Sequence, residues 1–177
     1  EDVPMILSSE PGVWAYSESG NGTGYSYVTI RGFDQSRIAV FFDGVPLNDN
    51  ESHQVYWVDH GDLLSDVDNI QIQRGIGNNL YGSSAFGGSI NVNTKIASDE
   101  REISGTIGSG DWNTQKIRAS YRSGSDLGDD LSLAVRLSDI KSDGYRQFHD
   151  SHQRGFSLGL EHRGKAINQF RALIGYE

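Results

Sequence analysis

Five segments in the second half of the chain alternate apolar and polar residues with the two-residue period of a β-strand. In one of them, Leu133, Val135 and Leu137 share one face, and Arg136 lies on the other. The predicted strands are roughly 7–11 residues long, about the length that crosses a bilayer obliquely. They cover residues 102–108, 115–121, 131–138, 156–161 and 170–176, and the predicted connectors are Ser109–Thr114, Arg122–Asp130, Ile140–Gln153 and Arg163–Asn168.

Two kinds of structure satisfy this pattern. One is a water-soluble antiparallel sheet with a single face on a core. The other is the opening part of a transmembrane β-barrel, with apolar side chains toward lipid and polar ones toward the lumen. In the second case Leu158 faces lipid, Arg136 and Ser157 face inward, and the barrel is not closed by this chain, because a barrel needs at least about eight strands.

Residues 1–98 have short apolar runs separated by clusters of glycine, asparagine and serine. We predict strands over 27–30, 37–42, 68–74 and 89–93, and single helical turns over 62–67 and 78–81. Residues 1–98 hold 12 acidic and 4 basic residues, and residues 99–177 hold 12 and 11, so net charges of −8 and −1 make up the total of −9. We therefore predict a small α+β domain over 1–98, followed by antiparallel strands over 99–177.

Composition and motif content exclude several classes of protein. There is no cysteine, so disulfides and thiolate metal sites are excluded. The longest apolar run, Ile38–Phe42, is far shorter than the roughly 20 residues of a spanning helix. The acidic half lacks the basic surface that nucleic-acid binding needs. There is no P-loop or G-x-S-x-G motif, and His53 and His60 lack zinc-site spacing. We expect no enzymatic activity, no nucleic-acid partner, no metal site and no cofactor.

Four sequence elements lie in a characteristic order within residues 2–95. They are Asp2-Val3-Pro4 with Glu10–Val13, then Val28–Phe33 (VTIRGF), then Val40–Asp49 (VFFDGVPLND), and finally Gln73–Gly75 with Leu80–Lys95 (LYGSSAFGGSINVNTK). Each element alone is weak. Together they resemble the plug domain of TonB-dependent outer-membrane receptors, and the strands after Lys95 are similar to the opening strands of the receptor barrel.

The resemblance implies an α+β plug domain followed by antiparallel strands of a transmembrane β-barrel, surrounded by bacterial outer-membrane lipid. It implies an active transporter that binds a scarce extracellular ligand and imports it to the periplasm with energy transmitted by the TonB complex. A ferric siderophore is the first expected ligand, with cobalamin or a glycan as alternatives. Family topology places the connectors 109–114 and 140–153 outside the cell and the other two inside. The family's TonB box, which precedes the plug, is not found in these residues.

Two arginines match the family's seating residues. Arg31 and Arg74 each precede a glycine at the end of a predicted strand. The resemblance implies that they pair with carboxylates on the barrel wall, which suits the planar guanidinium fork. The alternative is a solvated strand end.

Two segments are expected to be apical loops that contact the ligand, again by resemblance. They are Tyr16–Tyr27, with Tyr16, Tyr25 and Tyr27, and Asn48–Gly61, with His53, Tyr56, Trp57 and His60. Aromatic rings amid adaptable polar groups suit ligand recognition. The alternative is that Val55 and Trp57 pack the second loop onto the domain. Residues 48–62 hold four acids and no lysine or arginine, which disfavours binding of a strongly anionic chelate by this loop alone.

A different class of function, an extracellular carbohydrate-binding β module, also fits the alternating strands. Such a module would show a charged second face and would close on itself within the 177 residues.

Overall fold

The chain forms two compact units, residues 1–94 and 95–177. The computed structural model describes residues 2–60, 62–75, 85–94, 98, 100–124, 126–128, 130–163 and 167–176. An α+β unit followed by an open antiparallel sheet confirms the expected fold class. The domain boundary at residue 98 stays a prediction.

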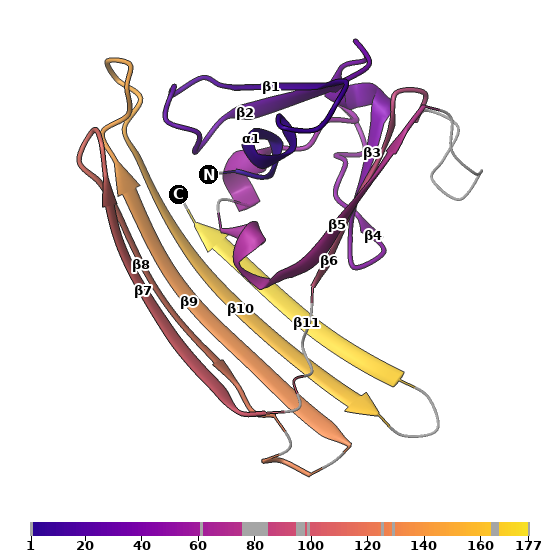
Figure 1. The fold of residues 1–177 in the computed structure, drawn as a ribbon, viewed down its shortest axis with the longest axis vertical. Helices are drawn as coiled ribbons and strands as arrows, with labels where there is room; N and C mark the ends of the chain where they lie inside the picture. The colour runs from indigo at the N-terminus through magenta and orange to yellow at the C-terminus, as the bar shows by residue number, and fades with distance from the viewer. Residues whose placement is uncertain are drawn as a thin grey trace. The chain divides into compact units, whose positions relative to one another are not determined.

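The first unit contains two small sheets and short helical elements (Figure 1). Strands β1 (Val13–Ser17) and β2 (Ser26–Ile30) form an antiparallel hairpin. The second sheet has the order β4-β3-β6-β5. Its strands are β3 (Ile38–Phe42), β4 (Val45–Pro46), β5 (Val67–Arg74) and β6 (Gly88–Thr94). The helical elements are α1 (Val3–Leu7) and the 3₁₀ turns η1 (Gln35–Arg37), η2 (Trp57–His60) and η3 (Leu63–Asp66).

The core of the first unit surrounds the parallel pair β3 and β6. Ile38 and Val40 are at most 1% exposed, which agrees with the nearly continuous apolar run of this strand. Helix α1 adds Val3 and Leu7, four residues apart and therefore on one helix face. The buried apolar cluster comprises Val3, Leu7, Val13, Val28, Ile30, Ile38, Val40, Phe42, Val55, Trp57, Leu63, Ile90 and Val92.

Two consecutive glycines allow three chain segments to meet where β6 begins. A Cβ atom added to Gly87 would lie 2.6 Å from the Cβ of Phe33. One added to Gly88 would lie 2.2 Å from the carbonyl oxygen of Gln73, and Gly88 has a φ of +146°. The glycine pair therefore brings the VTIRGF segment and the end of β5 into direct contact with β6.

Four predicted strands of the first unit are confirmed as β2, β3, β5 and β6, and the turn predicted over 62–67 is confirmed as η3. The turn predicted over 78–81 lies outside the described residues. Helix α1 and strand β1 were not predicted. The loop predicted over Tyr16–Tyr27 is corrected, because Tyr16 lies in β1, Tyr27 lies in β2, and the two residues are paired.

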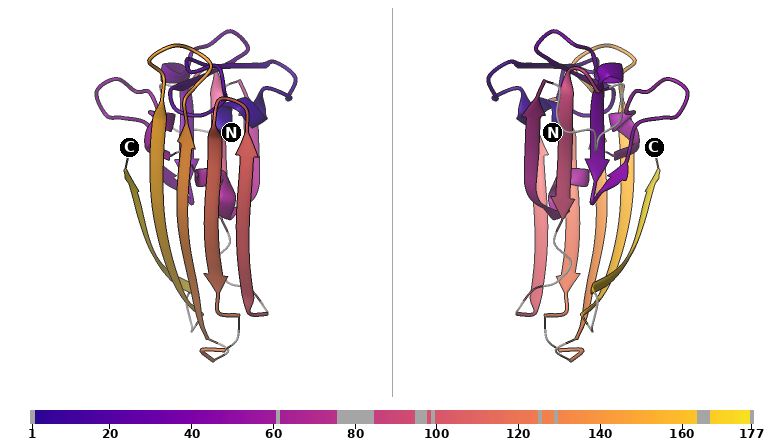
Figure 2. Two further views of the ribbon diagram at one scale, coloured as in Figure 1. Left: turned by 90° about the vertical axis from the view of Figure 1, so that its left-hand side faces the viewer. Right: turned by 90° about the vertical axis from the view of Figure 1, so that its right-hand side faces the viewer.

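The second unit is one sheet of five antiparallel strands in sequence order (Figure 2). They are β7 (Glu102–Gly110), β8 (Thr114–Arg122), β9 (Leu131–Ser142), β10 (Ser151–Arg163) and β11 (Ile167–Tyr176). All five predicted strands are confirmed. The connector predicted over Ile140–Gln153 is too long, because those two residues pair with each other and only residues 143–150 join β9 to β10.

One face of this sheet is apolar and exposed. Leu137 is 56% exposed, whereas its polar neighbour Arg136 is 5% exposed and lies on the opposite face. We call the first surface the apolar face; it comprises Ile103, Ile107, Ile117, Leu131, Leu133, Val135, Leu137, Phe156, Leu158, Leu160, Phe170 and Ile174. None of the helices in the described part of the chain is long and apolar enough to span a membrane.

Candidate functional site

The exposed side of the β1–β2 hairpin carries stacked aromatic side chains. Val13 and Ile30 point toward the core, so the alternate residues Trp14 and Tyr16 point away from it. The rings of Tyr16 and Tyr27 stack with centroids 5.0 Å apart, and those of Trp14 and Tyr16 lie 5.1 Å apart. Trp14 is 60% exposed and Tyr16 is 42% exposed. We call Trp14, Tyr16 and Tyr27 the aromatic platform.

The hairpin turn places a carboxylate and a third tyrosine beside this platform. The backbone N–H of Glu18 donates to the carbonyl oxygen of Tyr25 (2.9 Å). Burial raises the pKa of the Tyr27 hydroxyl above its ordinary value, and the nearby Glu18 carboxylate raises it further by charge and hydrogen bonding. Tyr16 and Tyr25 add smaller effects in the same direction. The structure thus groups the three tyrosines that the sequence singled out.

Asn48 anchors the loop that follows β4. Its Oδ1 accepts a hydrogen bond from the backbone N–H of Val40 (2.8 Å), and its Nδ2 donates to the carbonyl oxygens of Ile38 and His53 (2.9 Å each). The amide side chain therefore takes the place of a neighbouring strand along part of β3. This pairing fixes where residues 49–56 lie.

We expect Asn48→Leu to lower the free energy of unfolding by about 2 kcal/mol, because the N–H of the buried Val40 loses its acceptor. Asn50→Leu, an exposed position on the same loop, is the matched control and should change it by less than about 0.5 kcal/mol. Hydrogen exchange at the Val40 amide measures the effect. Equal protection in both variants would contradict the anchoring role.

The loop beyond Asn48 is ordered by its own side chains. The carboxylate of Asp49 accepts from the backbone N–H groups of Glu51 (3.1 Å) and Ser52 (2.7 Å). Hydrogen bonds from Ser52 and Glu51 lower the pKa of Asp49. His53 and Tyr56 are exposed. A pocket of about 190 Å³ borders this loop, lined by Ser36, Ile38, Ala39, Phe41, Pro46, Asn48, Asp49, Asn50, His53 and Ala85.

Trp57 and Val55 are both 2% exposed and belong to the core. This burial gives Trp57 a structural role in place of the ligand contact expected from the sequence. Packing of the loop onto the domain was the alternative reading, and it holds for both residues. His60, three residues later, is half-buried at the end of η2.

We expect His60 to make stability depend on pH. Burial lowers its pKa below the ordinary 6.5, with a smaller opposing effect from Asp59. The unfolded chain then takes up the proton first as the pH falls, so stability is full above pH 6.5 and declines between 6.5 and the lower folded-state pKa. Unfolding free energies measured across this range should fall less steeply in His60→Gln. His53→Gln is the matched control, and equal slopes in the two variants would contradict the assignment.

Arg31, directly after β2, and Arg74, the last residue of β5, contact the same stretch of chain. The backbone N–H of Arg31 donates to Gly12 (2.8 Å), and its Nη1 lies 3.2 Å from where a Cβ of Gly75 would stand. Nη1 of Arg74 donates to the carbonyl oxygen of Pro11 (2.6 Å). Within the described residues, no carboxylate forms an ion pair with either guanidinium. Two exposed cations thus lie close together, a grouping that their separation in sequence did not reveal.

The predicted ligand residues lie on two parts of the first unit, the tyrosines on the hairpin and the exposed residues on the 48–60 loop. Trp14 extends the first group and was missed by the sequence reasoning. Its two-residue spacing from Tyr16 is the signal that could have found it. In the described part of the chain, no group of three or more histidine or acidic side chains could hold a metal ion.

Comparison with known proteins gives a consistent assignment. Residues 1–89 match the family model described as "TonB-dependent Receptor Plug Domain". The chain is 32% identical over 142 residues to the vitamin B12 transporter BtuB of Vibrio vulnificus, covering 80% of this chain and 22% of that protein. It is 26% identical over 186 residues to the ferric enterobactin receptor PirA of Pseudomonas aeruginosa, covering 99% and 24%.

Solved structures share the fold across both units. The pyoverdine outer membrane receptor FpvA of Pseudomonas aeruginosa superposes with a TM-score of 0.77 at 14% identity, covering 98% of this chain and 25% of that one. The chain spans about a quarter of the length of the curated relatives it matches.

Proposed function

The chain belongs to the TonB-dependent receptor plug domain family of the bacterial outer membrane, and we propose that it is the N-terminal part of an active transporter. In this proposal residues 1–94 form the plug and β7–β11 are barrel strands. The transporter imports an extracellular ligand to the periplasm with energy received from the TonB complex. The family is non-enzymatic, which confirms the expectation that the chain is not an enzyme.

The single observation that carries the proposal is the apolar face that follows a plug-family domain. Ile103, Ile107 and Leu137 are more than half exposed, although burying such side chains would be favourable in water. Lipid is the solvent that matches this face. A soluble carbohydrate-binding module would instead show a charged second face and a closed sheet, whereas the described sheet is open at β7 and β11.

The aromatic platform and the exposed loop residues His53 and Tyr56 are our candidate ligand contacts. Residues 1–30 and 48–62 contain no lysine or arginine, so these contacts favour ring stacking and hydrogen bonding over ion pairing with an anion. We propose that the ligand is a metal-bearing organic complex, the class that includes vitamin B12 and ferric enterobactin, for which two relatives are named.

The paired arginines Arg31 and Arg74 would seat the plug. Two exposed arginines that contact neighbouring stretches of backbone, and that have no carboxylate partner in the described residues, are suited to bind acidic side chains of further barrel strands. In this proposal the two arginines contact the barrel wall and do not contact the ligand.

Ligand uptake tests the proposed function. The complete receptor is expressed in a Gram-negative host that lacks its own receptors, and uptake of labelled cobalamin and labelled ferric siderophores is measured with and without TonB. We expect accumulation of one ligand that disappears without TonB. Absence of uptake for every ligand, or uptake that persists without TonB, would contradict the proposal.

Binding to the same receptor tests the aromatic platform. We expect the double variant Trp14→Ala/Tyr16→Ala to weaken ligand binding by at least about tenfold, because stacked aromatic contacts contribute roughly 0.5–1.5 kcal/mol each beyond their buried area. Val45→Ala, an exposed apolar position off the hairpin, is the control. Unchanged affinity in the double variant would remove the platform from the ligand site.

A further inference from the structure

Charge on the apolar face is concentrated at one end of β9 and β10. Moving along the register, Leu133 pairs with Leu160, Val135 with Leu158, and Leu137 with Phe156. The next pair on the same face is Asp139 with Arg154, and then comes Lys141 with His152. We call Asp139, Lys141, His152 and Arg154 the rim cluster; it lies beside the 143–150 connector.

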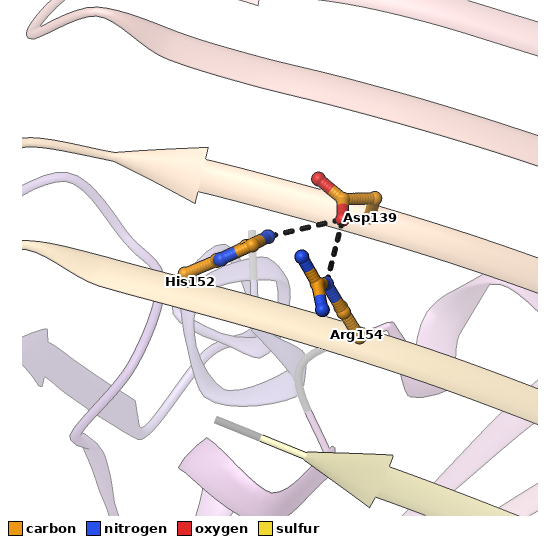
Figure 3. Close-up of polar contacts among 3 residues, drawn as sticks. All are labelled: Asp139, His152 and Arg154. Atoms are coloured by element: carbon orange, nitrogen blue, oxygen red, sulfur yellow. Dashed lines mark hydrogen bonds and ion pairs between the residues drawn. The ribbon is translucent and has the colours of Figure 1, made fainter.

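Asp139 holds two side chains of the neighbouring strand in place (Figure 3). Its Oδ2 lies 3.0 Å from Nε2 of His152 and 3.1 Å from Nε of Arg154. The Arg154 side chain nevertheless remains 60% exposed. The bond to Asp139 uses Nε and leaves the two terminal nitrogens of the guanidinium for other contacts.

The rim cluster carries excess positive charge. Lys141 and Arg154 against Asp139 leave a net charge of +1. This contrasts with the chain as a whole, whose net charge is −9. A guanidinium and an ammonium group on adjacent strands suit a phosphate group.

The spacing of the rim cluster fits a membrane boundary. Lys141 of the rim cluster lies ten residues from Leu131, the first residue of β9, which is about 33 Å along a strand and about 25 Å along the membrane normal at a tilt of roughly 40°. The apolar band of an outer-membrane barrel is about 25 Å tall, and its strands are tilted by roughly 40°. Thus, if β9 spans lipid, the rim cluster stands where hydrocarbon gives way to headgroups.

We propose that the rim cluster binds the phosphate of an anionic lipid headgroup in the outer half of the membrane. The inference rests on the proposed function, which places the apolar face in lipid, and on the family topology expected from the sequence, which puts the connector between β9 and β10 outside the cell. The lipid phosphate bridges the terminal nitrogens of Arg154 and the ammonium of Lys141, and Asp139 positions Arg154 for this contact.

Thermal unfolding of the complete receptor in a non-ionic detergent tests this site. The receptor is titrated with dihexanoyl-phosphatidylglycerol, with dihexanoyl-phosphatidylcholine and with inorganic phosphate. We expect phosphatidylglycerol to stabilise the receptor most, and Lys141→Gln/Arg154→Gln to weaken its apparent affinity by about tenfold or more, because both charge-assisted contacts are lost. His162→Gln, at the other end of β10 on the same face, should keep the wild-type affinity.

Equal affinity in the double variant and the wild type would overturn the proposal. Equal stabilisation by the two lipids would also overturn it. If inorganic phosphate stabilised the receptor as strongly as phosphatidylglycerol, the cluster would be a site for a free anion and the lipid proposal would be wrong. Measuring ligand uptake by the double variant distinguishes a failure of the lipid-site proposal from a failure of the proposed transport function. Normal uptake together with lost lipid affinity supports the site, whereas failure of uptake in the wild type would contradict the transporter assignment alone.

Discussion

Gly88→Ala is expected to disrupt the sheet of the first unit at a cost of roughly 4 kcal/mol. The new Cβ would lie 2.2 Å from the carbonyl oxygen of Gln73, so β5 and β6 could not keep their register. The backbone φ of +146° adds strain for any residue with a side chain. Overpacking and strained dihedrals each cost about 1–3 kcal/mol, which together give this magnitude.

Hydrogen exchange of the β5 and β6 amides in the complete receptor measures the change. Exchange should become faster by roughly a thousandfold, the equivalent of about 4 kcal/mol. Gly105→Ala is the matched control, because its Cβ would lie 3.9 Å from the nearest atom, at ordinary contact distance. Unchanged protection in Gly88→Ala would show that the pairing of β5 and β6 does not depend on this close approach.

Leu158→Arg is expected to destabilise the complete receptor in vesicles by about 2–4 kcal/mol, the cost of a cation near the middle of the bilayer. Leu158 lies on the apolar face between the rows of Leu160 and Phe156. On a surface in contact with water, the same substitution would change stability by less than about 0.5 kcal/mol. The two possible environments of the sheet therefore predict clearly different results.

Denaturant titration of the receptor refolded into vesicles measures this difference. Leu127→Arg is the matched control, because Leu127 is 47% exposed in the connector between β8 and β9. The Leu127→Arg substitution should leave the free energy of unfolding nearly unchanged. Equal costs for the two substitutions would argue against a lipid-facing sheet.

The strands of the second unit could be predicted because their alternation is strong and local. The error at Ile140–Gln153 has a physical origin. Lys141 and His152 continue the apolar face with polar side chains, so the strands extend beyond the apolar band and the sequence there reads as loop. Hydropathy alone reports where the apolar band ends and not where hydrogen bonding ends.

The first unit was less predictable because its elements are short. Helix α1 has five residues, too few to display a helical period, and its position depends on burial of Val3 and Leu7 in a core formed by distant segments. In strand β1 the outward-facing residues Trp14 and Tyr16 are large aromatic residues, so the strand lacks the alternation of apolar and polar residues that would reveal it in the sequence. Tertiary packing decided both elements.

The candidate site was predicted by residue type but not by geometry. Tyr16 and Tyr27 were selected as members of one loop, and strand pairing explains why they stack. Trp57 was selected for its ring, yet its burial could be learned only from the folded core. Arg31 and Arg74 are brought together by the packing of β1, β2 and β5, which no local pattern encodes.

A measurement of which β9 side chains face lipid is the most direct test of the account. The chain contains no cysteine, so single cysteines at positions 135–138 can carry a fluorophore, one position at a time, in the complete receptor. Quenching by brominated lipid acyl chains in vesicles is then compared along the strand. The account predicts strong quenching at 135 and 137 and weak quenching at 136 and 138. Uniform quenching, or quenching of 135 and 137 only by a water-soluble agent, would contradict it.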